Sequence, residues 1–405
     1  MTAHPNQQRL RLGLVGLGAA GRAFLPAVLA HGRFELAAVA EPGHEARGEI
    51  CQRTGVGGFE SLPAMLAGCD LDAVYIGTPT ELHGEHVMLA CAAGKHVLTE
   101  KPMSTSLDGA QAMVAAAERA GVVLLVGHSH SYDLPIKTMR DIIAGGDLGR
   151  LRMVHTWCFS DWIYRPRRPD ELNPELGGGV IYRQGAHQFD IIRLLGGGLL
   201  KSVRATAFDW DPERKSLGAH VAWLRFADGA TATAVYNGYG RLPGAELCFD
   251  VGEWGQPQRP QDRTAVPRAP LLPDEEIMAK RGRAKNAIPA AAPFQPFFGL
   301  TIVSCDRGDI RQSPHGLYLY TGADREEIVL PSDCNPRTLV LDEFAAAVLD
   351  NAPAVHDGRW GLATLEVCAA VLASSQSGRE VELMYQVPVQ RASVPPLRGR
   401  PERPA

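Results

Sequence analysis

The chain has 405 residues, of which 45% are hydrophobic, and a formal net charge of −4 at pH 7. This length exceeds what one core usually supports, so we expect two domains of a globular protein. The slightly negative charge argues against a nucleic-acid partner and an anionic membrane surface, and no apolar run reaches the roughly 18 residues that suggest a membrane span.

The N-terminal residues and the cysteines indicate the cellular compartment in which the protein is expected. The first residues, MTAHPNQQRL, contain no apolar segment of a secretory signal, and we expect residues 1–10 to be flexible. The eight cysteines include no C-x-x-C pair, which favours reduced thiols in the cytoplasm. His128 and His130 alternate at the end of an expected strand, but without a third ligand we expect no metal site.

Strands and helices alternate with short joints in the first part of the chain. An apolar strand from Leu10 meets a glycine-rich turn and continues as a helix. Further strands are expected at 34–41, 72–77, 96–99 and 122–126, and helices at 85–93 and 107–120. This alternation predicts an α/β Rossmann domain with a doubly wound parallel sheet over residues 11–150.

The regular alternation of strands and helices changes after residue 150. Period-two segments at 151–159, 202–210 and 220–238, the last with a turn at Asp228–Gly229, predict a large open, mainly antiparallel sheet in an α/β domain over 151–390. The helix after Gly179 is expected to pack against it, and further helices are expected at 338–350 and 361–374. Residues 255–296 lack clear periodicity and are either a surface excursion or a flap over a site. The tail, 391–405, is expected to be flexible.

The turn GLGAAG has the spacing G-x-G-x-x-G, between a strand and a helix. Gly16 permits the tight turn, Gly18 lets the backbone approach a pyrophosphate, and Gly21 lets helix and strand pack closely. The helix N-terminus then faces the phosphates. The predicted contacts of this turn are Gly16, Leu17, Gly18, Ala20 and Gly21.

Glu41 ends the second strand, where its carboxylate can accept the ribose hydroxyls of NAD and repel a 2′-phosphate. We therefore predict NAD as the cofactor. Arg47 lies one helical turn further and keeps NADP as the alternative. The loops after the next strands supply further predicted cofactor contacts, which are Gly77, Thr78, Pro79, His83, Glu100 and Lys101.

Lys101 follows a strand at the edge where ligands bind in open α/β sheets. Its side chain can stabilise the oxyanion that develops as hydride leaves carbon, and the Lys101–Pro102 peptide is a candidate for cis. His187 follows the glycine-rich turn GGG at 177–179, and an imidazole is a suited base for a hydroxyl proton. The alternative for His187 is a core histidine satisfied by Asp190 or by the backbone.

The motifs GLGAAG, TPTELHGEH, LTEKPMS and GGGVIYRQGAHQFDIIRLLGG resemble the glucose–fructose oxidoreductase / inositol dehydrogenase / rhizopine-catabolism (Gfo/Idh/MocA) family. The resemblance implies a Rossmann domain, a C-terminal α/β domain with a large open sheet, and NAD(P)-dependent hydride transfer. It also implies that Lys101 is the family's lysine and His187 its histidine.

Arg183 stands where the family usually has an aspartate, four residues before His187 and on the same helical face. A guanidinium cannot accept a hydroxyl hydrogen bond but pairs bidentately with carboxylates. We therefore predict a small-molecule substrate with a carboxylate near the reacting carbon. The alternative is that Arg183 pairs with Asp190 or Glu175.

The segment DWIYRPRRPDELNP adds Trp162, Tyr164 and Arg165 as candidate contacts of a flat, anionic ligand, and His128 is a further candidate. The alternative for this segment is a solvated basic loop or an oligomer contact.

Within the family, DWIYRPRRPDELNP, GGGVIYRQGAHQFD and CDRGDIRQSPHGLYLY most resemble the phthalate 4,5-cis-dihydrodiol dehydrogenases. That resemblance implies oxidation of phthalate cis-4,5-dihydrodiol to 4,5-dihydroxyphthalate. The alternatives are a sugar, inositol or sugar-acid dehydrogenase, and a non-catalytic NAD-binding sensor, against which Lys101 and His187 argue. An open sheet must cover its outer face, so we expect a homo-oligomer, either a dimer or a tetramer.

Overall fold

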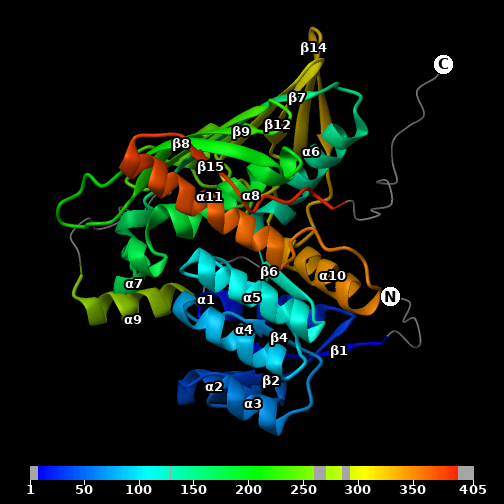
Figure 1. Ribbon diagram of the computed structural model, residues 1–405, viewed down its shortest axis with the longest axis vertical. Helices are drawn as coiled ribbons and strands as arrows, with labels where there is room; N and C mark the ends of the chain where they lie inside the picture. The colour runs from blue at the N-terminus through cyan, green and yellow to red at the C-terminus, as the bar shows by residue number, and fades with distance from the viewer. Residues whose placement is uncertain (1–7, 128, 260–270, 285–291, 391–405) are drawn as a thin grey trace.

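The computed structural model describes residues 8–127, 129–259, 271–284 and 292–390, which form two sheets with helices between and around them (Figure 1). Within these ranges, every helix is too short or too polar to cross a membrane.

The first sheet has six parallel strands in the order β3-β2-β1-β4-β5-β6, the strand order of a dinucleotide-binding domain. Its helix α5 has the predicted bounds, because Ser106 caps its first turn and Gly121 ends it in a left-handed conformation. The doubly wound parallel sheet is confirmed. The strands are β1 (Leu10–Val15), β2 (Phe34–Ala40), β3 (Gly57–Phe59), β4 (Ala73–Ile76), β5 (His96–Glu100) and β6 (Leu124–Gly127). The helices are α1 (Ala19–Ala30), α2 (His44–Thr54), α3 (Leu62–Gly68), α4 (His83–Ala92), α5 (Leu107–Ala120) and α6 (Leu134–Gly145).

The second sheet has nine strands in the order β14-β13-β12-β11-β7-β10-β9-β8-β15. All neighbours are antiparallel except β10 and β7, so the expected open, mainly antiparallel sheet is confirmed. The helices α8 (Ala186–Leu195) and α11 (Gly358–Ser377) lie between this sheet and the first domain (Figure 1). The strands are β7 (Leu151–Phe159), β8 (Leu200–Phe208), β9 (Ala219–Phe226), β10 (Thr231–Asn237), β11 (Leu300–Cys305), β12 (Gly308–Ser313), β13 (Gly316–Thr321), β14 (Asp324–Val329) and β15 (Val381–Glu382).

Helix α10 (Pro336–Leu349) returns to the first sheet although it follows the strands of the second. Val340, Leu341 and Phe344 are fully buried and share one core with residues of β1 and α1. The ring of Phe344 stacks on Phe34 of β2, with ring centroids 6.2 Å apart. The late part of the chain therefore contributes to the dinucleotide-binding core.

Residues 255–296 contain a helix that the sequence analysis did not predict. Helix α9 spans Pro273–Ala284 and has three acidic residues in its first turn, which favours a helix N-terminus. It lacks a clear apolar stripe, and its contacts are ionic: Glu276 pairs with Arg214, and Lys280 pairs with Glu171. Glu171 belongs to the short helix α7 (Pro169–Leu172). Ion pairs with distant residues, which periodicity cannot reveal, thus help to hold α9 in place.

Candidate active site

The glycines of the turn between β1 and α1 differ in how closely other backbone atoms approach them. Gly16 has φ +90, and a Cβ there would lie 2.8 Å from the carbonyl oxygen of Gly77. A Cβ at Gly21 would lie 2.0 Å from the carbonyl oxygen of Gly16. At Gly18, by contrast, an added Cβ would meet no described atom within 4 Å. This arrangement fits a pyrophosphate at the N-terminus of α1.

Glu41 lies at the carboxyl end of β2, beside this turn. Its two carboxylate oxygens accept hydrogen bonds from the backbone N–H groups of Leu17, at 2.8 Å, and Gly43, at 3.1 Å. Arg47, which kept NADP as an alternative, donates to the carbonyl oxygen of Glu41 at 2.6 Å and pairs with Glu60 at 3.2 Å. These contacts occupy the Arg47 guanidinium, which would otherwise be the partner of a 2′-phosphate. The surroundings of Glu41, where the ribose is expected, therefore fit NAD.

His83 joins the loops that follow β4 and β5. It is 1% exposed, with Nδ1 3.0 Å from the carbonyl oxygen of Pro102 and Nε2 2.9 Å from that of Thr78. Burial lowers the pKa of His83 to about 4, although the hydrogen bonds to the Thr78 and Pro102 carbonyls favour the protonated ring and oppose that shift. Both ring nitrogens face protein carbonyls, which suits a residue that positions the two loops around a cofactor.

Lys101 connects the two domains. It follows β5, the Lys101–Pro102 peptide is cis, and Nζ donates a 2.8 Å hydrogen bond to the carbonyl oxygen of Arg183. Burial lowers the pKa of Lys101 to about 8, although the carboxylates of Glu100 and Glu253 oppose that shift. Glu100 itself accepts a 2.9 Å hydrogen bond from the Tyr75 hydroxyl. A buried amine with a lowered pKa is typical of a catalytic site.

Arg183 and His187 lie on successive segments rather than on one regular helix. Residues Ile181–Gly185 form a π-helical turn, and the α-helix α8 begins at Ala186. The winding thus differs from the regular α-helix expected over Arg183 and His187, and their place on one helical face stays a prediction. The Arg183 carbonyl that accepts from Lys101 lies in this wide turn, and such turns occur frequently at functional sites.

The Arg183 side chain is largely but not fully buried, with 14% of its surface exposed. Among the described residues, its Nε and Nη2 atoms have no hydrogen-bond partner. Nη2 lies 3.7 Å from Asp170 Oδ2, which already accepts a 2.6 Å hydrogen bond from Arg168. Asp190, one of the alternative partners, instead accepts from Trp360 Nε1 at 2.5 Å. Two open donors on a buried guanidinium fit a carboxylate ligand.

His187 is 5% exposed and lies in the first turn of α8. Its ring meets His130 edge to face, with centroids 4.8 Å apart, and it packs on Phe298 at 5.1 Å. His130 is in turn contacted by Trp254 at 5.0 Å and by the carboxylate of Glu253 at 3.2 Å. The sequence analysis did not find Glu253, Trp254 or Phe298, because these residues carry no motif and reach the site only through the fold.

The aromatic and basic segment after β7 is packed within the second domain. Trp162 is 1% exposed, and the guanidinium of Arg167 lies 4.1 Å from the centre of its ring. The Tyr164 hydroxyl donates to Asp211 at 2.8 Å, and Arg165 donates to Asp161 at 2.7 Å. Their roles as substrate contacts stay predictions. His128 lies outside the described residues.

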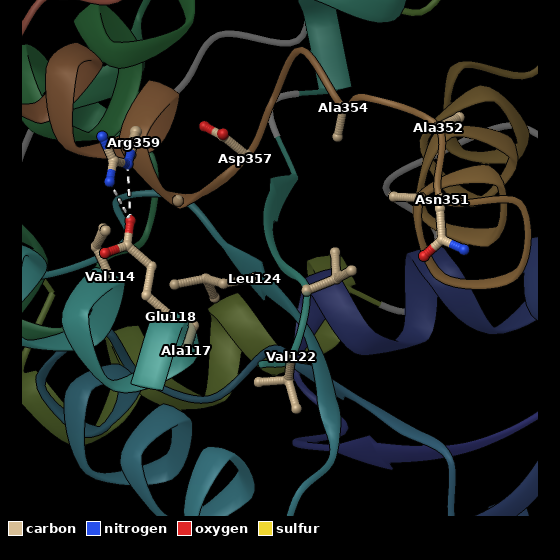
Figure 2. A pocket seen from close by; sticks show the side chains of 13 residues that line it. Val114, Ala117, Glu118, Val122, Leu124, Asn351, Ala352, Ala354, Asp357 and Arg359 are labelled. Carbon is tan, nitrogen blue, oxygen red and sulfur yellow. Dashed lines mark hydrogen bonds and ion pairs between the residues drawn. The ribbon is translucent and has the colours of Figure 1, made fainter. Parts of the chain in front are cut away.

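A separate pocket of about 290 Å³ lies near the start of β6 (Figure 2). Lys101 follows the end of β5, which runs parallel to β6, so it lies at the other end of these strands. Apolar side chains such as Val114 and Leu124 line it, and an ion pair between Glu118 and Arg359, at 2.6 Å, lies at its side. This pocket is therefore distinct from the cofactor crevice.

A parallel sheet of this strand order and a glycine-rich first turn are the features of a dinucleotide-binding domain. Residues 10–128 match the family model described as "Oxidoreductase family, NAD-binding Rossmann fold", and residues 136–247 match the "GFO/IDH/MocA C-terminal domain". The chain belongs to the GFO/IDH/MocA family, and NAD is its cofactor.

Relatives of known name agree with this assignment. The chain is 35% identical, over 90% of its length and 94% of the relative's, to 1-carboxy-3-chloro-3,4-dihydroxycyclohexa-1,5-diene dehydrogenase of Comamonas testosteroni. A solved structure from Bordetella bronchiseptica RB50 is 36% identical with a TM-score of 0.85, covering 93% of this chain and 100% of that chain. The WlbA dehydrogenase of Bordetella pertussis, in complex with NADH and UDP-GlcNAcA, shares the fold at 23% identity and a TM-score of 0.70, covering 93% of this chain and 98% of that chain.

Proposed function

We propose that this enzyme oxidises a carboxylated cyclic cis-dihydrodiol with NAD, and that phthalate cis-4,5-dihydrodiol, giving 4,5-dihydroxyphthalate, is its best candidate substrate. The observation that carries the proposal is the Arg183 guanidinium, two of whose nitrogens are buried without a hydrogen-bond partner among the described residues, in the residue whose carbonyl accepts from Lys101. The relative from Comamonas testosteroni supports it, because its name describes a carboxylated ring with two adjacent hydroxyls.

NAD and the side chains of Lys101, His187 and Arg183 each have a different role in the proposed reaction. NAD supplies the acceptor for the hydride that leaves the carbinol carbon. Lys101 has two further N–H donors beyond the one given to Arg183, and these can stabilise the oxygen as negative charge develops. His187 takes the hydroxyl proton, and Arg183 holds the carboxylate so that the ring cannot rotate. The resulting ketone loses a ring proton as it tautomerises, which restores aromaticity and gives a catechol.

A sugar-acid dehydrogenase is the second candidate. A uronate also carries a carboxylate for Arg183, and the fold neighbour from Bordetella pertussis was solved with UDP-GlcNAcA. A neutral sugar or an inositol offers only uncharged hydroxyl acceptors and cannot form the bidentate pair of a guanidinium with a carboxylate. The desolvated amine of Lys101, with its lowered pKa, and the buried His187 support turnover over a non-catalytic sensor.

The test is NADH formation with a panel of substrates at fixed NAD. We expect turnover with phthalate cis-4,5-dihydrodiol or with a monocarboxylated cis-dihydrodiol, and little with the neutral benzene cis-dihydrodiol. Turnover of glucuronate but of no dihydrodiol would favour the second candidate. Turnover of myo-inositol alone would overturn the carboxylate role of Arg183.

We also propose that a second copy of the chain covers the outer face of the nine-stranded sheet. Trp157, Val221 and Trp223 are 46%, 47% and 40% exposed there. The register places Trp157 and Val221 on either side of Val235 in β10, so these side chains form one patch. Sedimentation should show a homo-oligomer that Trp223→Asp dissociates, whereas Met384→Asp, at an exposed residue that follows β15, should not. A monomeric parent chain would contradict this.

A further inference from the structure

His130 is buried between two carboxylates. It lies in the 3₁₀ turn Ser129–Tyr132 that follows β6 and is 1% exposed. Its Nδ1 lies 3.1 Å from Asp133 Oδ2, and its Nε2 lies 3.2 Å from Glu253 Oε1. Ionised carboxylate oxygens only accept hydrogen bonds, so both ring nitrogens must carry a proton. The geometry therefore makes the ring an imidazolium.

The charges around His130 maintain that state. Burial disfavours the charged ring, but Asp133 and Glu253 outweigh it and raise the pKa of His130 to about 9. Burial also acts to raise the pKa of Glu253, but the hydrogen bond from His130, with the charges of Arg165 and Lys101, lowers it to about 2. On the other side, Arg337 of α10 opposes the burial that raises the pKa of Asp133. With pKa values of about 9 and about 2, His130 and Glu253 are both ionised at neutral pH.

The imidazolium lies against the proposed base. The rings of His130 and His187 are 4.8 Å apart with an angle of 79° between their planes. Phe298 covers both, with its ring 4.4 Å from that of His130 and 5.1 Å from that of His187. Phe298 is itself 7% exposed, so little water screens the two rings from one another. A positive charge at this distance disfavours a second one on His187, and the carboxylates of Asp133 and Glu253 oppose that effect.

We propose that His130 is a positioning residue whose permanent positive charge keeps His187 neutral, and therefore able to accept a proton, at physiological pH. This rests on the proposed function in that His187 is the base. Glu253 belongs to the second domain and His130 to the loop after β6, so one of the two contacts that maintain this charge forms across the domain boundary. Trp254, next to Glu253, also makes contacts across this boundary. Its ring lies 5.0 Å from the His130 ring and 5.1 Å from the Arg337 guanidinium.

The test is the pH profile of kcat/KM for the carboxylated cis-dihydrodiol that the substrate panel selects. In the parent enzyme the acid limb reports protonation of the base. His130→Gln removes a positive charge beside His187, so the limb should move to higher pH by about one unit or more, a loss of roughly tenfold on its acid side. Glu253→Gln removes a negative charge while Asp133 still holds His130 protonated, so the limb should move to lower pH.

Opposite shifts separate electrostatics from damage to the structure. Phe298→Leu is the matched control, because it loosens the same contact without changing charge: kcat should fall while the acid limb keeps its position. NADH affinity and the unfolding temperature show that each variant folds. Shifts in one direction for both charge variants, or no shift in either, would overturn the proposal. If His130→Gln does not fold, an unmoved limb in Glu253→Gln overturns it alone.

Two further measurements distinguish this proposal from the one it rests on. If His187→Ala retains the parent's acid limb, His187 is not the base and the mechanism of the proposed function fails, whatever His130 does. Ring-nitrogen NMR of histidine-labelled protein needs no substrate: His130, assigned by its loss in His130→Gln, should stay doubly protonated to about pH 9. A neutral His130 ring at pH 7 would contradict the proposal directly.

Discussion

Replacing Arg183 by methionine separates ligand binding from folding in a single variant. Methionine keeps most of the length and the apolar stem but removes the buried charge. Asp170 keeps its 2.6 Å hydrogen bond from Arg168, so Arg183→Met does not leave that carboxylate without its partner. Two buried N–H groups of Arg183 that have no hydrogen-bond partner among the described residues are removed.

The two consequences have opposite signs. Hydrogen bonds to a charged group contribute about 1.5–3 kcal/mol each, so losing two to a substrate carboxylate lowers kcat/KM by roughly 10²–10⁴-fold. A buried donor without a partner costs about 1–3 kcal/mol, so the free energy of unfolding of the ligand-free enzyme should rise by about that amount in Arg183→Met. Activity thus falls while stability rises.

The assay measures NADH formation with the carboxylated cis-dihydrodiol and with its neutral counterpart, together with urea unfolding and NADH affinity. We expect the loss for the acid alone, with NADH affinity unchanged. Arg359→Met, at the pocket opposite Lys101, is the control for removal of an arginine and should leave turnover unchanged. Equal losses for the acid and the neutral diol, or a loss of stability, would refute the reasoning.

Three further predictions follow from the site. His187→Ala should lower turnover by about 10²–10⁴-fold with NADH affinity kept, and undiminished turnover would remove His187 from the mechanism. Gly21→Ala should abolish NADH binding in a fluorescence titration, because its Cβ would lie 2.0 Å from the Gly16 carbonyl oxygen, and unchanged affinity would contradict the tight turn. His83 has a folded pKa of about 4 against an ordinary 6.5, so the unfolded state binds more protons between these values. The free energy of unfolding should therefore fall by about 3 kcal/mol as pH drops through that window, and the fall should be smaller in His83→Gln.

Local patterns predict the parts of the site that the chain builds from neighbouring residues. The glycine turn, the acid at the end of β2 and the lysine after β5 each depend on a strand and the loop that follows it. Parallel sheets place such loops at one edge, so their meeting could be expected from the sequence.

Other parts arise only from contacts between distant segments. Glu253 contacts His130 across 123 residues, and Lys101 contacts Arg183 across 82. The π-helical turn at Ile181–Gly185 has the apolar spacing of an ordinary helix, and α9 depends on ion pairs with Glu171 and Arg214. No periodicity encodes these features, because they depend on contacts between segments that are distant in the sequence.

The measurement that tests the central claim most directly is a product balance with purified enzyme, NAD and phthalate cis-4,5-dihydrodiol. The account predicts one NADH for each 4,5-dihydroxyphthalate formed, and a rate that collapses in Arg183→Met. Steady NADH formation from neutral sugars or inositols, with none from any carboxylated dihydrodiol, would contradict it.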